Sequence, residues 1–356
     1  MNTHKNCNVD DIQNLFKNKQ NIAIITHTYP DADGLSSLVV LKNRLENCFS
    51  DAKNPKRVDI YSDVLELDEL YSPILKNDNL NGQKVLGNYD LAIGVDCTDP
   101  NRFGSFKYIF ENAKETLNID HHDTNTFFAD YNFVYKTSST CELLYLLMAK
   151  MQVNMPASMC KLVYAGIITD TNNLTQGNVN DKTYAIINKF IRSGVEIDKV
   201  QEHFFKSNTL SKMKLLEKAI HSLRFASDGK LAIMKLNKAD YIECDANPDT
   251  DTLGIVDYAI SLKDAKIAML ILKQEDNTYH ISLRSKGQIN VGQIARHFGG
   301  GGHEHMAAFN AGTITDFKDD FLKICDKEFE RIEKQKDEPN DLFFDEPRNE
   351  TTEFEF

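Results

Sequence analysis

Short apolar runs that each end next to an acidic side chain constrain the fold of this chain more than any other feature. Such runs cover residues 22–25, 91–95, 116–119 and 162–168. Each is short enough to be a buried strand, and segments with helical spacing lie between them. Strands that alternate with helices form βαβ units, so the sequence predicts an α/β domain with a mainly parallel sheet.

The segment that follows the first run is the most informative one. Residues 27–37 read HTYPDADGLSS, in which Pro and Gly bracket a turn, and residues 35–45 then predict a helix. The turn places His27, Asp31 and Asp33 at the carboxyl end of a strand, where open α/β sheets bind their ligands. An imidazole and carboxylates suit a divalent ion such as Mn²⁺. A solvated turn with a helix-capping Asp explains the same residues, and this segment alone leaves both interpretations open.

The other runs end at further candidate ligands. Together with the first segment they supply His27, Asp31, Asp33, Asp96, Asp120, His121, His122 and Asp170. We expect these residues to follow strands of one sheet and therefore to share one edge of it. Two divalent ions about 4 Å apart need roughly six protein ligands and one shared carboxylate. Asp96 is the expected bridge because its strand is expected in the middle of the sheet.

The composition excludes several classes of protein. The 356 residues carry a formal net charge of −12, which disfavours a broad basic face for long nucleic acid. An anionic substrate therefore has to be held by a few local groups. No apolar run approaches a membrane span, and the polar first residues have no signal-peptide core. The seven scattered cysteines form no CxxC pair, so we expect reduced thiols, a cytoplasmic location and no membrane association.

The pattern changes near residue 200, and the length of the chain favours two domains. We expect a catalytic metal-binding domain over residues 1–200, a helical linker over 201–228 and a smaller mixed α/β domain over 229–334. The smaller domain has predicted strands at residues 231–236, 265–273 and 278–284 and predicted helices at residues 252–262, 291–298 and 317–334. Residues 335–356 are acidic, contain prolines and predict a disordered tail.

Several of these segments, taken in order, resemble the motifs of the DHH phosphoesterase superfamily. In the first domain they are residues 27–37, 94–96, 119–122, 138–144 and 166–171, and in the second domain residues 282–286 and 299–303 resemble the DHH-associated domain. Each motif alone is weak, but their order and spacing over residues 10–325 are specific. The layout is most similar to the group of nanoRNase/pAp phosphatases and stand-alone cyclic-di-AMP phosphodiesterases. RecJ-type exonucleases usually lack a residue like His27, which favours that group.

The resemblance implies two Mn²⁺ ions per active site, although other divalent ions could serve. It assigns one ion to His27, Asp31 and Asp96, and the other ion to Asp33, Asp96, His121 and Asp170. His122 would face the substrate phosphate, and Asp120 would orient a neighbouring histidine. A water shared by the two ions would attack phosphorus at neutral pH, with Asp96, His122 and Asp120 as the catalytic residues.

The second domain is implied to bind the substrate. Four glycines after a predicted helix leave backbone N–H groups open to a phosphate or ribose, and Arg284 at a strand end could clamp a phosphate. The expected substrate-binding residues are His122, Arg284, Ser285, Gly300, Gly301, Gly302 and His303. A helix C-cap followed by a turn is the alternative for the glycines. The residues Glu304-His305-Met306 depart from the Lys or Asn and small residues that usually follow in this family.

These observations predict a metal-dependent phosphoesterase that hydrolyses short nucleotides in the cleft between two domains. The expected substrates are linear dinucleotides such as pApA, nano-RNA, cyclic di-AMP and pAp. A family II-like pyrophosphatase or exopolyphosphatase is one alternative, and a non-catalytic cyclic-dinucleotide sensor is the other. Members of the family often dimerise, which leaves a homodimer open as the assembly.

Overall fold

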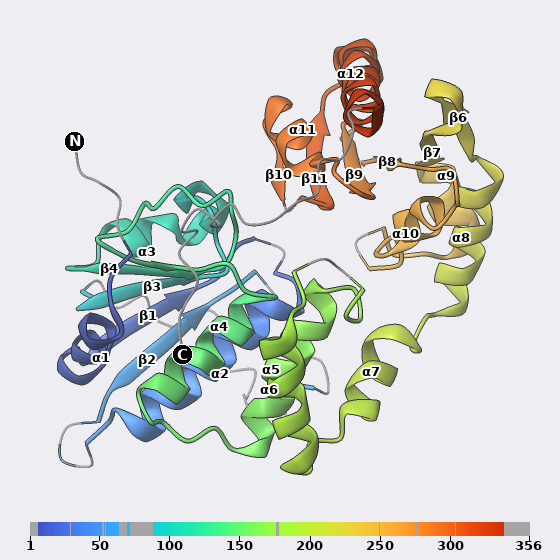
Figure 1. Cartoon of the computed structure of the whole chain (residues 1–356). Helices are drawn as coiled ribbons and strands as arrows, with labels where there is room; N and C mark the ends of the chain where they lie inside the picture. Colours follow the sequence, from blue (N-terminus) through green and yellow to red (C-terminus); the bar gives the residue numbers. More distant parts are fainter. Residues whose placement is uncertain are drawn as a thin grey trace. The chain divides into compact units, whose positions relative to one another are not determined.

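The computed structural model describes residues 6–337 except 29, 52, 54, 64–69, 72–87, 176, 177, 249, 275 and 303 (Figure 1). His303 and most of the predicted tail therefore lie outside the described residues. The chain forms two compact units, the first ending at Lys206 and the second beginning at Ser207. Each unit has its own sheet and its own hydrophobic core.

The first unit contains a five-stranded sheet in the order β2-β1-β3-β4-β5. Its strands are β1 (Asn21–Ile25), β2 (Arg57–Tyr61), β3 (Leu91–Val95), β4 (Thr116–Asp120) and β5 (Tyr131–Val134). All four pairings are parallel, which confirms the predicted parallel sheet. The strand that ends before Asp96 is in the centre of the sheet, as expected. The strand at residues 131–134 was not predicted, since four residues give little pattern to recognise.

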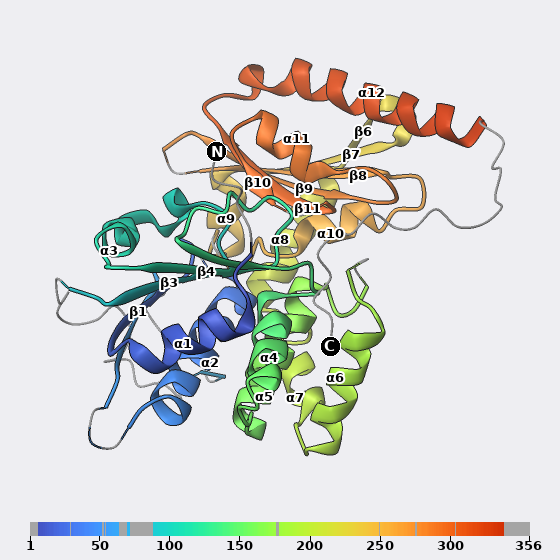
Figure 2. The same ribbon diagram turned by 60° about the vertical axis from the view of Figure 1, so that its left-hand side comes forward.

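The helices of this unit lie on both faces of the sheet. They are α1 (Val9–Asn18), α2 (Ala32–Cys48), η2 (Pro100–Phe106), α3 (Lys107–Glu111), α4 (Thr140–Lys150), α5 (Ala157–Asp170), α6 (Asp181–Arg192) and α7 (Ile197–Phe205). Figure 2 shows α3 on one side of the sheet and α1 and α4 on the other.

Alternate residues of each strand point to opposite faces, and both sets are buried. Ile22 and Ile24 of β1 pack with α1, α2, α4 and α5, whereas Ala23 and Ile25 pack with η2 and α3. None of these four side chains is exposed to solvent. A parallel sheet covered on both faces explains why its strands are continuous apolar runs rather than alternating ones.

One predicted strand is wrong. Residues 162–168 belong to the helix α5, whose side chains are buried on nearly all sides among the other helices of the unit. A helix surrounded by apolar neighbours has no polar face, so its sequence shows no helical period and resembles a buried strand. Asp170 is consequently the last residue of a helix and does not follow a strand. Asp33 also lies on a helix, in the first turn of α2, and not on the preceding loop.

The second unit contains a six-stranded mixed sheet in the order β10-β11-β9-β8-β7-β6. Its strands are β6 (Arg224–Ala226), β7 (Leu231–Leu236), β8 (Ile267–Lys273), β9 (Tyr279–Ser285), β10 (Gly301–Gly302) and β11 (Met306–Ala311). The β7–β8 pair is parallel and the other pairs are antiparallel, which confirms the predicted mixed domain.

Helices cover both faces of this second sheet. They are α8 (Leu210–His221), η3 (Ser227–Gly229), α9 (Lys238–Cys244), α10 (Ile255–Ile260), α11 (Val291–His297), η4 (Ile314–Asp316) and α12 (Lys318–Asp337). One core lies under α8, α9 and α10, and the other lies under α11 and α12. Among the described helices, none combines the length and the apolar character that crossing a bilayer requires.

Candidate functional site

Seven of the predicted site residues come together in the first unit, where strands β1, β3 and β4 end. Their potential ligand atoms form three groups, each with all atoms within 4.8 Å of one another: His27, Asp31 and Asp96; Asp33, His121 and Asp170; and Asp96, His121 and His122. Asp96 and His121 each belong to two groups, so the three groups make one continuous cluster. The cluster combines three strand ends with the start of α2 and the end of α5.

The loop between β1 and α2 is held close to Asp96. Asp31 is the N-cap of α2, and its Oδ1 accepts hydrogen bonds from the backbone N–H groups of Asp33 at 3.1 Å and Gly34 at 3.0 Å. The helix-capping interpretation of Asp31 is therefore correct, and the same residue also belongs to the cluster. A Cβ atom at Gly34 would lie 2.6 Å from Thr26 Oγ1 and 3.2 Å from Asp96 Oδ2, so only glycine allows this approach.

The start of helix α4 fixes two of the carboxylates. The backbone N–H groups of Thr140 and Cys141 donate to the two oxygens of Asp33, at 2.7 and 2.9 Å. These are free N–H groups of a helix N-terminus, where a negative charge is favoured. The hydroxyl of Thr140 donates to Asp96 Oδ1 at 2.8 Å. Thr140 therefore bonds to both carboxylates, and nothing in the sequence had indicated this role for it.

The three histidines of the cluster share one orientation. In each ring Nδ1 faces an oxygen acceptor: Thr28 O at 2.9 Å for His27, Thr137 O at 3.1 Å for His121, and Asp120 Oδ1 at 2.7 Å for His122. A ring that donates its Nδ1–H to such an oxygen presents the lone pair of Nε2 on its other side. When it is neutral, each ring can therefore offer Nε2 as a metal ligand or a hydrogen-bond acceptor.

A chain of hydrogen bonds connects His122 through Asp120 to Asn125. Asp120 lies between His122 and Asn125, whose Nδ2 donates to Asp120 Oδ2 at 2.6 Å and to Asn118 Oδ1 at 2.7 Å. The hydrogen bond from the histidine to Asp120 is the contact that the resemblance implied, and its effect on activity stays a prediction. Asn125 was missed because a single Asn in a loop has no distinctive spacing.

The charges of the cluster favour bound cations. Burial and the neighbouring Asp96 carboxylate raise the pKa of Asp33 well above its usual range, and the same two causes raise the pKa of Asp31, although that residue keeps part of its surface exposed. Burial alone would lower the pKa of His121, but the Asp170 and Asp33 carboxylates raise it to about 10. Asp31 and Asp33 therefore tend to retain protons unless another positive charge is present, whereas the neighbouring histidines lower the pKa of Asp96 and of Asp120. Oxygen and imidazole donors at this density fit divalent metal ions.

The predicted substrate residues of the second unit include Arg284 and Ser285 on β9. Arg284 donates from Nε to Asp257 Oδ1 at 2.7 Å and from Nη1 to Leu283 O at 3.0 Å, so part of its hydrogen-bonding capacity is already used. Ser285 is buried and donates to Ile289 O at 2.6 Å. Ser285 therefore stabilises the loop before α11, and its contact with a substrate stays a prediction.

Three of the four consecutive glycines are required by the fold itself. Gly299 has φ +77° directly after α11 ends, which is the C-cap alternative. A Cβ at Gly300 would lie 2.1 Å from Ala308 O, and Gly302 has φ +135°. A Cβ at Gly301 would meet no other atom within 4 Å, so the space around this residue does not require glycine, and its contact with a substrate stays a prediction.

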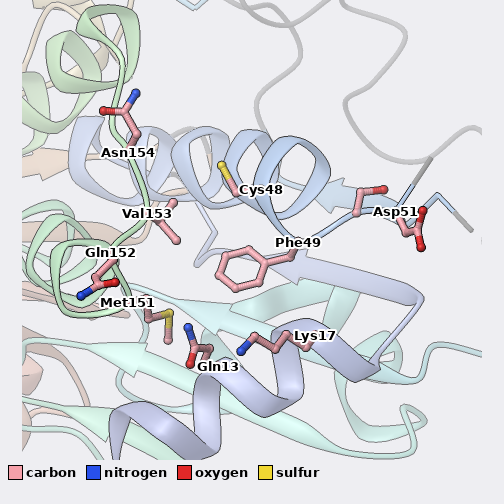
Figure 3. A pocket seen from close by; sticks show the side chains of 10 residues that line it. Gln13, Lys17, Cys48, Phe49, Asp51, Met151, Gln152, Val153 and Asn154 are labelled. Carbon is pink, nitrogen blue, oxygen red and sulfur yellow. The ribbon is translucent and has the colours of Figure 1, made fainter.

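A cavity of about 460 Å³ lies elsewhere in the first unit (Figure 3). Gln13 and Lys17 of α1, Cys48 at the end of α2 and Asn154 after α4 are among its lining residues. Helix α2 has 17 residues, so this cavity lies roughly 25 Å from the cluster at the other end of the helix. None of the predicted site residues lines it, and it is not the candidate site.

Comparisons with known proteins agree with this arrangement. Residues 21–167 match the DHH family, N-terminal domain, and residues 228–331 match the DHHA1 domain. The chain is 27% identical over 337 residues to the MG371 homolog of Mycoplasma pneumoniae, an uncharacterized protein, covering 92% of this chain and 96% of that protein. It is also 27% identical over 336 residues to the bifunctional oligoribonuclease and PAP phosphatase NrnA of Mycoplasma genitalium, covering 90% of this chain and 98% of that protein.

The fold is also found in a solved structure. An exopolyphosphatase-related protein from Bacteroides fragilis matches with a TM-score of 0.78 and 20% sequence identity. The match covers 92% of this chain and 97% of that one. At this identity the likeness concerns the fold alone.

Proposed function

Because this chain belongs to the DHH family of phosphoesterases, we propose that it hydrolyses short nucleotides with the help of two divalent metal ions. The observation that carries the proposal is the cluster of three ligand groups, which Asp96 and His121 link because each belongs to two of them. A carboxylate common to two groups is what a pair of ions about 4 Å apart requires.

Two of the ligand groups support the assignment implied by the resemblance. His27, Asp31 and Asp96 would hold one ion, and Asp33, Asp96, His121 and Asp170 would hold the other. Bound divalent ions, for which we propose Mn²⁺, lower the pKa of water and polarise phosphoryl oxygens. The histidines contribute Nε2, since their Nδ1 atoms are bonded elsewhere.

His122 is the residue proposed to contact the substrate phosphate in this unit. To donate to a phosphate oxygen through Nε2 while Nδ1–H stays on Asp120, the ring must carry both protons. The Asp120 carboxylate then balances the charge of the imidazolium, and Asn125 keeps the carboxylate in place. A positive ring aimed at the phosphate stabilises the charge that develops during attack.

The proposed substrates are pApA, nano-RNA and pAp, with cyclic di-AMP as a further candidate. The printed name of the M. genitalium relative, an oligoribonuclease and PAP phosphatase, supports this class, since it aligns with 90% of this chain. The net charge of −12 also favours short substrates held by a few local groups. In the second unit, Arg284 and Gly301 are the proposed contacts.

Two alternatives are less well supported. A family II-like pyrophosphatase or exopolyphosphatase would share the ligand cluster, but the match to the DHHA1 domain over residues 228–331 favours a nucleotide substrate. A non-catalytic sensor is expected to have lost ligands, whereas His27, Asp96 and the other predicted ligands all carry ligating side chains.

The proposal is tested by product analysis with purified protein and Mn²⁺. pApA, a five-residue RNA, pAp, cyclic di-AMP and pyrophosphate are offered side by side. We expect mononucleotides from pApA and short RNA, and phosphate from pAp. Turnover of pyrophosphate alone would contradict a nucleotide substrate. Tight binding of cyclic di-AMP with no turnover of any substrate would favour the sensor.

Thr140 provides a sharper test of the metal site. Thr140→Val removes the hydroxyl that donates to Asp96 and keeps the N–H that donates to Asp33. We expect Mn²⁺ affinity to fall by about 10-fold or more, because groups that orient metal ligands typically contribute 10- to 100-fold. Calorimetric titration with Mn²⁺ measures the change. Thr140→Ser restores the donor and should bind Mn²⁺ like the wild type; equal affinity in the valine variant would contradict the role.

A further inference from the structure

The cluster presents no net positive charge to a phosphate, even with two ions bound and His122 protonated. Five carboxylates surround the site, those of Asp31, Asp33, Asp96, Asp120 and Asp170. Two divalent ions balance four of these charges and the proposed His122 imidazolium balances the fifth, so the cluster carries no net positive charge. An approaching phosphodiester is negative, and the whole chain carries −12. A further cation beside the cluster would therefore strengthen the binding of a phosphate.

Arg102 is attached to the cluster by its backbone. It lies on η2, which begins four residues after Asp96, and its carbonyl accepts a hydrogen bond from Thr28 N at 2.7 Å. Thr28 directly follows the cluster residue His27. A Cβ on the nearby Gly104 would lie 2.4 Å from Thr28 Cγ2, which shows how closely η2 packs on this loop. Arg102 is thus fixed beside the group formed by His27, Asp31 and Asp96.

The guanidinium of Arg102 is unpaired among the residues that the structure describes. It is half-buried, and within the described part of the chain it makes no hydrogen bond and no ion pair. Other arginines of the chain are paired, as Arg57 is with Asp59 and Arg284 is with Asp257. The hydrogen bond from Thr28 to its carbonyl holds Arg102 next to the loop that carries His27 and Asp31.

We propose that Arg102 is a substrate-binding residue whose guanidinium donates hydrogen bonds to the phosphate group under attack. The assignment rests on the proposed function, and it adds a residue that neither the sequence motifs nor the comparisons had indicated. The planar fork of Arg matches two oxygens of one phosphate, which a single ammonium group cannot do. Arg102 would add a positive charge beside a cluster that is otherwise neutral overall.

The test compares Arg102→Gln with Arg192→Gln. Arg192 is exposed at the end of α6, so its variant loses the same charge away from the cluster. We expect kcat/KM of Arg102→Gln to fall by about 10- to 100-fold on both pApA and unphosphorylated ApA, the range for a lost charge-assisted hydrogen bond. Binding of inorganic phosphate to the Mn²⁺-loaded protein, measured by calorimetry, should weaken by a similar factor. Mn²⁺ affinity and the melting temperature should match those of Arg192→Gln.

Several outcomes would overturn the assignment. They are phosphate binding by Arg102→Gln that equals that of Arg192→Gln, absence of phosphate binding by the wild type, and a parallel loss of Mn²⁺ affinity. A loss of activity on pApA but not on ApA would mean that Arg102 contacts the terminal phosphate. This result would also overturn the assignment. Arg102→Lys keeps the positive charge but lacks the planar guanidinium, and we expect its loss of kcat/KM to be smaller than that of Arg102→Gln.

Failure of the assignment and failure of the proposed function can be told apart. A protein that binds phosphate through Arg102 and hydrolyses none of the substrates would contradict the function and support the assignment. A protein that hydrolyses pApA equally well with and without Arg102 would support the function and contradict the assignment.

Discussion

Asp96→Asn is expected to abolish hydrolysis of every substrate, with a loss of at least about 10³-fold in kcat/KM. Asp96 groups with His27 and Asp31 of one proposed metal site and lies 3.8 Å from His121 of the other, so an amide in its place should weaken both sites at once. Losing the stabilisation that two ions give the transition state costs several kcal/mol, and each 1.36 kcal/mol corresponds to tenfold in rate. Asparagine is the right replacement because Asp96 has φ +54°, a conformation that Asn tolerates well. Steady-state kinetics with Mn²⁺ measures the loss.

Asp123→Asn is the matched control for this variant. Asp123 follows the histidine pair directly, is exposed and pairs only with the exposed Lys136 at 3.1 Å among the described residues. Surface ion pairs of this kind contribute little, so we expect less than about a threefold change in rate. Activity of Asp96→Asn within about tenfold of the wild type would contradict the two-ion proposal.

The metal-free protein is expected to lose stability as the pH rises from about 6.5 toward 10, and divalent ions are expected to restore it. The pKa of His121 is raised from 6.5 to about 10 in the folded chain, so its contribution is complete below pH 6.5 and is lost through pH 10. The raised pKa of Asp33 acts in the same direction, because a carboxyl group that holds its proton in the folded state destabilises that state once ionised. Bound divalent ions would supply the positive charge that these protons provide in the metal-free protein.

Thermal melting at pH 6, 7, 8 and 9, with EDTA or with excess Mn²⁺, measures this effect. The rise in melting temperature caused by Mn²⁺ should grow with each pH step, since fewer protons compete for the ligands. Asp33→Asn is the matched variant: it removes one crowded carboxyl group and should flatten the pH dependence of the metal-free protein. A rise that stays constant or shrinks between pH 6 and 9 would contradict the expected competition.

The parts of the site that could be predicted are those encoded locally. Asp96 and Asp120 end apolar runs of five residues or fewer, and such runs are strands whenever both faces of the sheet are covered. The edge they share follows from parallel topology alone. The same reasoning was wrong for Asp170, because the helix before it is buried on nearly all sides and has no polar face to reveal its period. Its side chain reaches the cluster nonetheless, 3.3 Å from His121 Nε2.

The parts that could not be predicted depend on distant neighbours. Thr140 contacts Asp96 across 44 residues, and nothing in a Thr at a helix start distinguishes this role from ordinary capping. Gly300 and Gly302 are required by backbone that returns in β11, so a sequence of four glycines suggested a ligand loop where the fold needs most of them itself. Only the structure shows that the guanidinium of Arg102 pairs with none of the described residues.

The bonds from the start of α4 to Asp33 have a consequence for how the protein matures. They join positions 107 and 108 residues apart, so the complete ligand set does not exist in a short nascent segment or in the unfolded chain. A metal ion that needs this set binds only after most of the unit has folded and then shifts the equilibrium by mass action, by about 1.4 kcal/mol for each tenfold of free ion above the dissociation constant. If the proposed metal dependence holds, the supply of divalent ions would influence how long the chain stays folded as well as its rate of turnover.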